Sequence, residues 1–106
     1  MLLGIGSPQF ASADTAMTAG VVMKDMPVRE RTSFIIGVVE GLAYARFRYD
    51  SATAGHKEEG GMNCIYNWLY KDTTTTMDRI ESTFRKYEQH LPSVLLAAMI
   101  KKECGE

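Results

Sequence analysis

Apolar residues recur at helical spacing through most of the chain, and the most apolar stretch is residues 27–50. At 100° per residue, its apolar side chains fall on one broad stripe and, near the middle, on the opposite side as well. A helix that is apolar nearly all round is usually central, with other elements packed on several sides. We therefore predict a long central helix over residues 27–50. The first stripe comprises Phe34, Ile35, Val38, Leu42, Ala45 and Tyr49, and the opposite side comprises Ile36, Val39, Ala43 and Phe47.

Two glycines, Gly37 and Gly41, lie four residues apart in the predicted long helix and share a third face. Glycine in a helix interior costs about 1 kcal/mol relative to alanine. Close approach of another helix across a groove without side chains would compensate for this cost. We therefore expect Gly37 and Gly41 to be helix-packing positions.

Shorter elements flank the long helix. A first helix has three candidate N-caps, Asp14, Thr15 and Thr18, and is expected to direct Met17, Val21 and Val22 toward the core. Residues 51–61 have no apolar period and contain three glycines, so they predict a mobile loop. Residues 62–70 fit either a helix or a strand. We favour the helix because no second strand is available to pair with it.

The C-terminal third predicts two more helices. The first carries an apolar seam and follows Thr75 and Asp78, which resemble a capping box. Pro92 ends that helix and opens the last one, over residues 93–103, with Gly105 as a typical stop. The seam comprises Met77, Ile80, Phe84, Tyr87 and Leu91, and the last helix is expected to direct Val94, Leu95, Ala98 and Met99 inward.

The composition fits one all-α domain, a bundle of four to five helices over residues 14–106. The chain has 106 residues, 45% of them hydrophobic, and a formal net charge of -1. This charge gives no overall electrostatic basis for binding nucleic acid or an acidic membrane. No run approaches 18 apolar residues, so we predict no membrane span.

The first thirteen residues resemble the end of a secretory signal. Ala11-Ser12-Ala13 is a small-x-small site of the kind that signal peptidase cuts, and a short apolar run and Pro8 precede it. The alternative is a disordered cytosolic N-terminus. Under the first interpretation the protein is exported, residues 1–13 are a leader remnant, and the mature chain begins near Asp14.

The two cysteines, Cys64 and Cys104, are forty positions apart and belong to no C-x-x-C pair. With only two histidines in the chain, a four-ligand zinc site is not expected. A catalytic thiol would need a neighbouring base and an electropositive setting, which the sequence does not indicate. In an exported protein an even pair of cysteines predicts a disulfide, here between Cys64 and Cys104.

The sequence offers little catalytic chemistry. Glu40 lies among apolar neighbours, either as a buried carboxylate or as a group hydrogen-bonded to another helix or reaching water. Gly60-Gly61 lacks the G-K-[ST] sequence and the preceding strand of a phosphate loop. We therefore predict no enzymatic activity, no cofactor and no metal.

The expected partner-binding surface is the loop together with the aromatic segment that follows it. A long irregular loop is often functional or disordered, and tryptophan and tyrosine most often dominate interface energies. The alternative is that the aromatic side chains are packed in the core. The candidate partner-binding residues are His56, Glu58, Glu59, Tyr66, Trp68 and Tyr70.

Several of these features occur in one order that resembles a known family. Thr18-Ala19-Gly20 opens the first helix, and Phe34 to Val38 is followed by Glu40-Gly41. A cysteine, an amphipathic helix ending near a proline, and a final helix closing with a cysteine follow. This order is similar to the small periplasmic helical proteins typified by the Tai-type immunity proteins of type VI secretion amidases. The resemblance implies a compact all-α domain, export, a disulfide, protein binding as a monomer or homodimer, and no enzymatic residues.

The functional expectation is therefore a bacterial periplasmic protein-binding domain, immunity-like, that neutralises a peptidoglycan-amidase effector. The alternative is a periplasmic chaperone or carrier for apolar clients. That alternative would use the seven methionines and the group of Tyr66, Trp68 and Tyr70.

Overall fold

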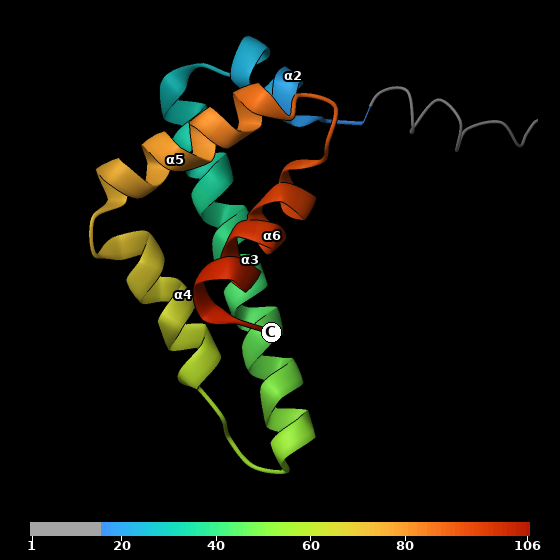
Figure 1. The fold of residues 1–106 in the computed structure, drawn as a ribbon, viewed down its shortest axis with the longest axis vertical. Helices are drawn as coiled ribbons and strands as arrows, with labels where there is room; N and C mark the ends of the chain where they lie inside the picture. The colour runs from blue at the N-terminus through green and yellow to red at the C-terminus, as the bar shows by residue number, and fades with distance from the viewer. Residues whose placement is uncertain (1–15) are drawn as a thin grey trace, which may run out of the picture.

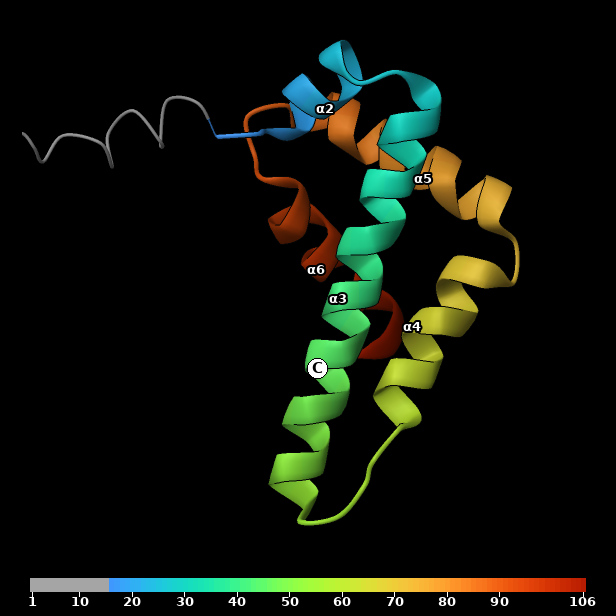
Figure 2. The ribbon, with the colours of Figure 1, turned by 180° about the vertical axis from the view of Figure 1, so that it is seen from behind.

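The computed structural model describes residues 16–106, which form five helices (Figure 1). The expected leader remnant, residues 1–13, and the candidate caps Asp14 and Thr15 lie outside the described residues. Viewed from behind, α3 runs the length of the molecule, and α4 returns beside it after a turn at the lower end (Figure 2). The helices are α2 (Ala19–Asp25), α3 (Val28–Ala54), α4 (Gly60–Tyr70), α5 (Thr73–Lys86) and α6 (Pro92–Cys104).

The short helix α2 begins at the third of the candidate caps. The side chain of Thr18 accepts a hydrogen bond from the backbone N–H of Val21 at 3.3 Å. Val22 is fully buried, but Val21 and Met17 are exposed, which corrects the expectation that both face the core. The helix ends at Met26, whose extended backbone matches the restriction on a residue before proline.

The long helix α3 is confirmed and runs four residues beyond the predicted end. Asp50 pairs with Arg46 inside the helix, and Gly55 ends it with a φ of 79°. One line of side chains at i, i+4 and i+8 is fully buried, namely Ile35, Val39 and Ala43. The predicted stripe extends too far toward the C-terminus, because Ala45 and Tyr49 are exposed.

The expectation that a helix crosses at Gly37 and Gly41 is wrong. A methyl group added at either glycine would meet no atom within 4 Å, and both residues are exposed. The close approach occurs instead at Gly61 in α4. A Cβ there would lie 2.5 Å from Nε of Arg46 and 2.7 Å from Oδ2 of Asp50. The helices α3 and α4 therefore approach each other closely at Gly61 of α4.

The aromatic segment is helical, so the strand alternative is excluded. α4 begins at Gly60, and the preceding loop is only residues 55–59, about half of the predicted length. Ile65 and Leu69, one turn apart, are buried in the core. The loop is short because the residues after Asp50 continue α3 for another turn.

The amphipathic helix α5 is shorter than its apolar period predicted. Its N-cap is Asp72, whose carboxylate accepts from the backbone N–H and the hydroxyl of Thr75, so the Thr75–Asp78 capping box is wrong. The bond from the Thr75 side chain, more than the one from its backbone, lowers the pKa of Asp72. The buried seam covers Met77, Ile80 and Phe84.

The predicted seam does not continue past the end of α5. The helix ends at Lys86, and Tyr87 and Leu91, which belong to the turn that follows, are 42% and 44% exposed.

The face that the last helix buries matches the expected one only in part, at Leu95 and Met99. Leu95, Leu96 and Ile100 are buried, Met99 is half-buried, and Val94 and Ala98 are exposed. The helix begins at Pro92 and ends at Gly105, whose φ is 71°. Among residues 16–106, no helix has the length and apolar character needed to cross a membrane.

Two long-range links hold the helices together. Arg31 of α3 pairs with Glu81 of α5 at 3.0 Å and also donates to the carbonyls of Met23 and Met26 at the end of α2. Cys64 of α4 and Cys104 of α6 form the predicted disulfide, with their Cα atoms 5.9 Å apart. The ion pair joins the helices at the end of the molecule that carries α2, and the disulfide joins them toward the opposite end.

Candidate functional site

The aromatic side chains of α4 do not form one surface. Positions two residues apart on a helix point about 200° apart. Tyr70 reaches α3, where its hydroxyl donates to the carboxylate of Glu40, and the ring of Tyr66 lies 6.3 Å from the Tyr70 ring. Trp68 points instead to the side of α5 and α6, where it borders a depression with Arg79 and Met99. Tyr66 and Trp68 are half-buried and pack on the core, whereas Tyr70 is 46% exposed.

The loop lies at the other end of α4 from Tyr70. An 11-residue helix spans about 16 Å at 1.5 Å per residue, which separates the loop from Tyr70. Glu58 is held by two bonds: its N–H donates to Ser51 at 2.9 Å, and its carboxylate accepts from the N–H of Gly60 at 3.2 Å. His56 and Glu59 are exposed. The predicted partner-binding residues therefore lie in separate places, and their role in binding remains a prediction.

Glu40 is exposed rather than buried, and its hydrogen bond to Tyr70 confirms the interpretation of a link to a neighbouring helix. The bond to Glu40, with smaller contributions from burial and from the Glu40 charge, raises the pKa of Tyr70 above its ordinary value. This hydrogen bond links Glu40 of α3 to the C-terminal end of α4.

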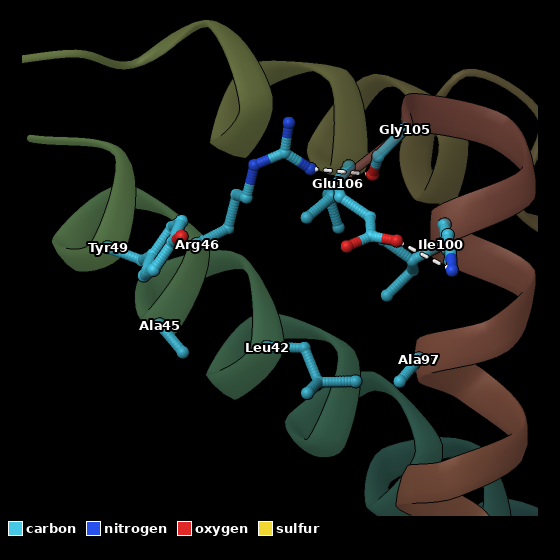
Figure 3. A pocket seen from close by; sticks show the side chains of 10 residues that line it. Leu42, Ala45, Arg46, Tyr49, Ala97, Ile100, Gly105 and Glu106 are labelled. Atoms are coloured by element: carbon cyan, nitrogen blue, oxygen red, sulfur yellow. Dashed lines mark hydrogen bonds and ion pairs between the residues drawn. The ribbon is translucent and has the colours of Figure 1, made fainter. Parts of the chain in front are cut away.

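A concave apolar site lies between the C-terminal halves of α3 and α6, and we call it the α3–α6 groove (Figure 3). Its volume is about 480 Å³. Leu42 and Ala97 face each other across its floor, and Tyr49 stands at one edge. The lining residues are Leu42, Ala45, Arg46, Tyr49, Ile65, Ala97, Ile100, Lys101, Gly105 and Glu106.

Charged groups converge on one end of the α3–α6 groove. Arg46 donates to Asp50 at 2.7 Å and to the backbone carbonyl of Gly105 at 2.9 Å, and its side chain is largely buried. Lys101 lies 2.6 Å from the carboxylate of Glu106. Gly61 leaves the space that the Arg46 guanidinium occupies. An apolar floor with a few convergent polar groups is typical of a binding site.

The sequence does not reveal the α3–α6 groove, because the periodicity of α3 places three of its lining residues, Leu42, Ala45 and Tyr49, in the apolar stripe. The apolar stripe of α3 was extended to Ala45 and Tyr49, although no helix covers those positions. On α6, the small residue Ala97 is followed one turn later by Lys101, a pairing that fits a partly exposed face. The one available signal was the placement of Arg46 and Asp50 one turn apart, an ion pair that is uncommon inside a core.

A second apolar depression, the α5–α6 groove, lies on another side of α6. Its volume is about 400 Å³. Tyr87 and Val94, with Leu91 beside them in the chain, are the exposed large apolar residues of this region. The lining residues are Thr83, Tyr87, His90, Val94, Leu95, Ala98, Met99 and Lys102.

Within residues 16–106, His, Cys, Asp and Glu side chains form no group of three or more that could hold a metal ion. Both cysteine sulfurs are engaged in the disulfide. Comparisons of the chain with protein-family models, curated proteins and solved structures gave no match. The features that bear on function are the two grooves, the loop and the charges around them.

Proposed function

We propose that this chain is an exported bacterial domain that binds a protein partner through the α3–α6 groove, immunity-like in architecture, and that it neutralises a peptidoglycan amidase. The observation that carries the proposal is the groove itself, an apolar floor of Leu42, Ala97 and Ile100 with Arg46 and Lys101 at one end. Exposed Tyr49 at its edge is of a residue type that often contributes most to interface energy. A pre-formed apolar site with a charged end suits recognition of a protein surface.

The disulfide supports export. Disulfides persist in oxidising compartments such as the bacterial periplasm and are rare in the cytosol. Here Cys64 and Cys104 join α4 to the end of α6, next to Gly105 and Ile65 of the groove. An oxidising compartment would therefore also hold one wall of the groove in place.

The export part of the proposal is tested by fractionation. The native gene, expressed in a bacterial host with a C-terminal tag, is expected to yield protein in the osmotic-shock fraction with its thiols unreactive to maleimide. Retention in the cytoplasm with two reactive thiols would contradict export.

The binding part is tested with a matched pair of substitutions on neighbouring residues of α6. Ala97 lines the α3–α6 groove and Ala98 lines the α5–α6 groove, and both are exposed. Ala97→Arg is expected to abolish rescue of growth when a candidate peptidoglycan amidase, sought among the neighbouring genes, is directed to the periplasm. Ala98→Arg is expected to leave rescue intact. Equal rescue by both variants, or no rescue by the unmodified chain, would refute the proposal.

A second candidate function is a periplasmic chaperone or carrier for apolar clients. It is favoured by the α5–α6 groove, where Tyr87, Leu91 and Val94 are 42%, 44% and 52% exposed. Under this hypothesis a dye for apolar surface gains fluorescence on acidification, and Ala98→Arg, not Ala97→Arg, suppresses that gain. No gain on acidification would count against it.

A further inference from the structure

The residues after α6 turn back across one end of the α3–α6 groove (Figure 3). Gly105 has a φ of 71°, a backbone conformation that glycine adopts without strain, and it redirects the chain toward α3. Arg46 binds the Gly105 carbonyl at 2.9 Å, and Lys101 binds the Glu106 carboxylate at 2.6 Å. Glu106 thus lies at the cationic end of a groove whose floor is apolar.

The electrostatic setting favours an anion at this position. The hydrogen bond from Lys101 lowers the pKa of Glu106, and the positive charges of Lys101 and then Arg46 act in the same direction. The same bond to Glu106 raises the pKa of Lys101. Lys101 therefore binds the Glu106 carboxylate directly, whereas Arg46, bonded to Asp50 and to the Gly105 carbonyl, acts on it only through its charge.

The Lys101–Glu106 pair is also easily exchanged. The two side chains are 66% and 73% exposed, and an ion pair this open to water is weak. Arg46 is different, because Asp50 and the Gly105 carbonyl fix its guanidinium and its side chain is only 18% exposed. The Arg46–Asp50 pair is therefore fixed on the α3 side of this end of the groove, whereas Glu106 can leave Lys101.

We propose that the α3–α6 groove accepts an acidic residue of a protein partner with apolar neighbours, and that Glu106 occupies the same cationic position in the free domain as an internal competitor. The partner carboxylate takes the place of Glu106 between Lys101 and Arg46, while the neighbouring apolar side chains cover Leu42, Ala97 and Ile100. The inference rests on the proposed function, because it names the chemistry of the partner segment that this groove recognises.

A peptide segment fits the groove better than a fatty acid, which shares the same carboxylate-plus-apolar chemistry. Small-molecule sites usually bury most of the ligand surface. Here the groove lies between two helices, and two of its lining residues, Ala45 of α3 and Ala97 of α6, are both exposed. A surface groove of this kind can bind alternate side chains of a peptide segment while the peptide backbone stays outside the groove.

The test uses the full, disulfide-bonded chain and three probes: a blocked peptide with glutamate between leucines, the same peptide with glutamine, and dodecanoate. Binding is followed by isotope-edited NMR. The glutamate peptide is expected to bind more tightly than the glutamine peptide and to shift the signals of Leu42, Ala97 and Ile100. Glu106→Gln is expected to increase the affinity for the glutamate peptide about two- to fivefold and to leave the affinity for the glutamine peptide unchanged.

Glu103→Gln is the matched control, since Glu103 is an exposed acid of α6 that faces the Trp68 side. This substitution removes the same charge and is expected to leave the affinities for both peptides unchanged. The proposal is overturned if neither peptide binds or both bind equally. It is equally overturned if the Glu103 and Glu106 variants behave alike, or if dodecanoate binds more tightly than the glutamate peptide. The Ala97→Arg test of the proposed function uses no acidic probe. Failure of the acidic-segment proposal would therefore leave partner binding through the groove open to its own test.

Discussion

The two halves of α3 differ in what covers them. In the N-terminal half, Ile35 and Val39 are fully buried, and Arg31 pairs with Glu81 of α5. In the C-terminal half, Tyr44 and Tyr49 are 55% and 69% exposed, and the neighbouring helix α6 leaves the α3–α6 groove open. One continuous helix therefore serves as core at one end and as a surface at the other.

The difference shows how a small domain can keep an open apolar groove. The packed end of the molecule supplies the buried apolar area. This core includes Phe84 of α5 and Leu96 of α6, which are fully buried. The open half has fewer buried side chains and relies on the disulfide and on the bonds of Arg46. Stability and exposure are thus assigned to opposite ends of the same fold.

The largest expected effect comes from shortening one side chain of the buried core. Phe84→Ala removes a fully buried ring and is expected to lower the free energy of unfolding by about 3–5 kcal/mol. Tyr87→Ala, at an exposed position three residues later, is expected to cost much less. Urea denaturation followed by circular dichroism measures both. Similar losses in the two variants would erase the distinction between core and surface in this region.

Removing the disulfide is expected to act mainly on the open half. Replacing Cys64 and Cys104 together by serine releases a link between positions 40 residues apart. The chain-entropy model gives a loss of about 4 kcal/mol, and typical measured losses are about 2–4 kcal/mol. Hydrogen exchange is expected to quicken most in the end of α6 and the start of α4. Uniform quickening that includes α5 would show that the two halves are not separable.

A smaller effect of opposite sign is expected at Gly37. Because open space surrounds it, Gly37→Ala is expected to stabilise the protein by about 0.5–1 kcal/mol through higher helix propensity. Gly20→Ala is the contrasting control. A Cβ there would lie 3.0 Å from Cβ of Glu88 and 3.2 Å from its carbonyl oxygen, so it should destabilise. A destabilising Gly37→Ala in thermal melts would restore the idea of a helix crossing on that face.

The smallest effect concerns Tyr70. Its pKa is raised in the folded protein by the bond to Glu40, so the associated stability is complete below the unfolded-state pKa near 10.0. It is lost as the pH rises through the folded-state pKa. In an ultraviolet absorbance titration, Tyr70→Phe is expected to remove a tyrosine ionisation that occurs above the ordinary value of 10.0, and Glu40→Gln to shift that step to lower pH. An unchanged titration in both variants would show that the pair does not persist in solution.

Periodicity predicted the helices well and their exposure less well. The helices, the Thr18 cap and the Gly105 stop followed from local chemistry that needs no knowledge of neighbours, and the disulfide followed from the even number of cysteines and the expectation of export. The exposure of Tyr49, Tyr87, Leu91 and Val94 did not follow, because a periodic apolar position is buried only where another helix covers it.

The glycine assignment failed for the same reason. Gly37 and Gly41 look like contact points within one helix, yet the contact uses Gly61, whose neighbour Arg46 lies fifteen residues earlier in the chain. The groove depends on which residues of α3 and α6 are left uncovered, and that is a property of the tertiary arrangement.

The most direct test of the α3–α6 groove as the docking surface is hydrogen–deuterium exchange of the oxidised chain with and without a candidate peptidoglycan amidase sought among the neighbouring genes. The expected result is new protection in peptides covering residues 42–49 and 97–105, with residues 83–91 unchanged. Protection confined to residues 83–91, or to the loop at residues 55–59, would contradict a partner seated in the α3–α6 groove.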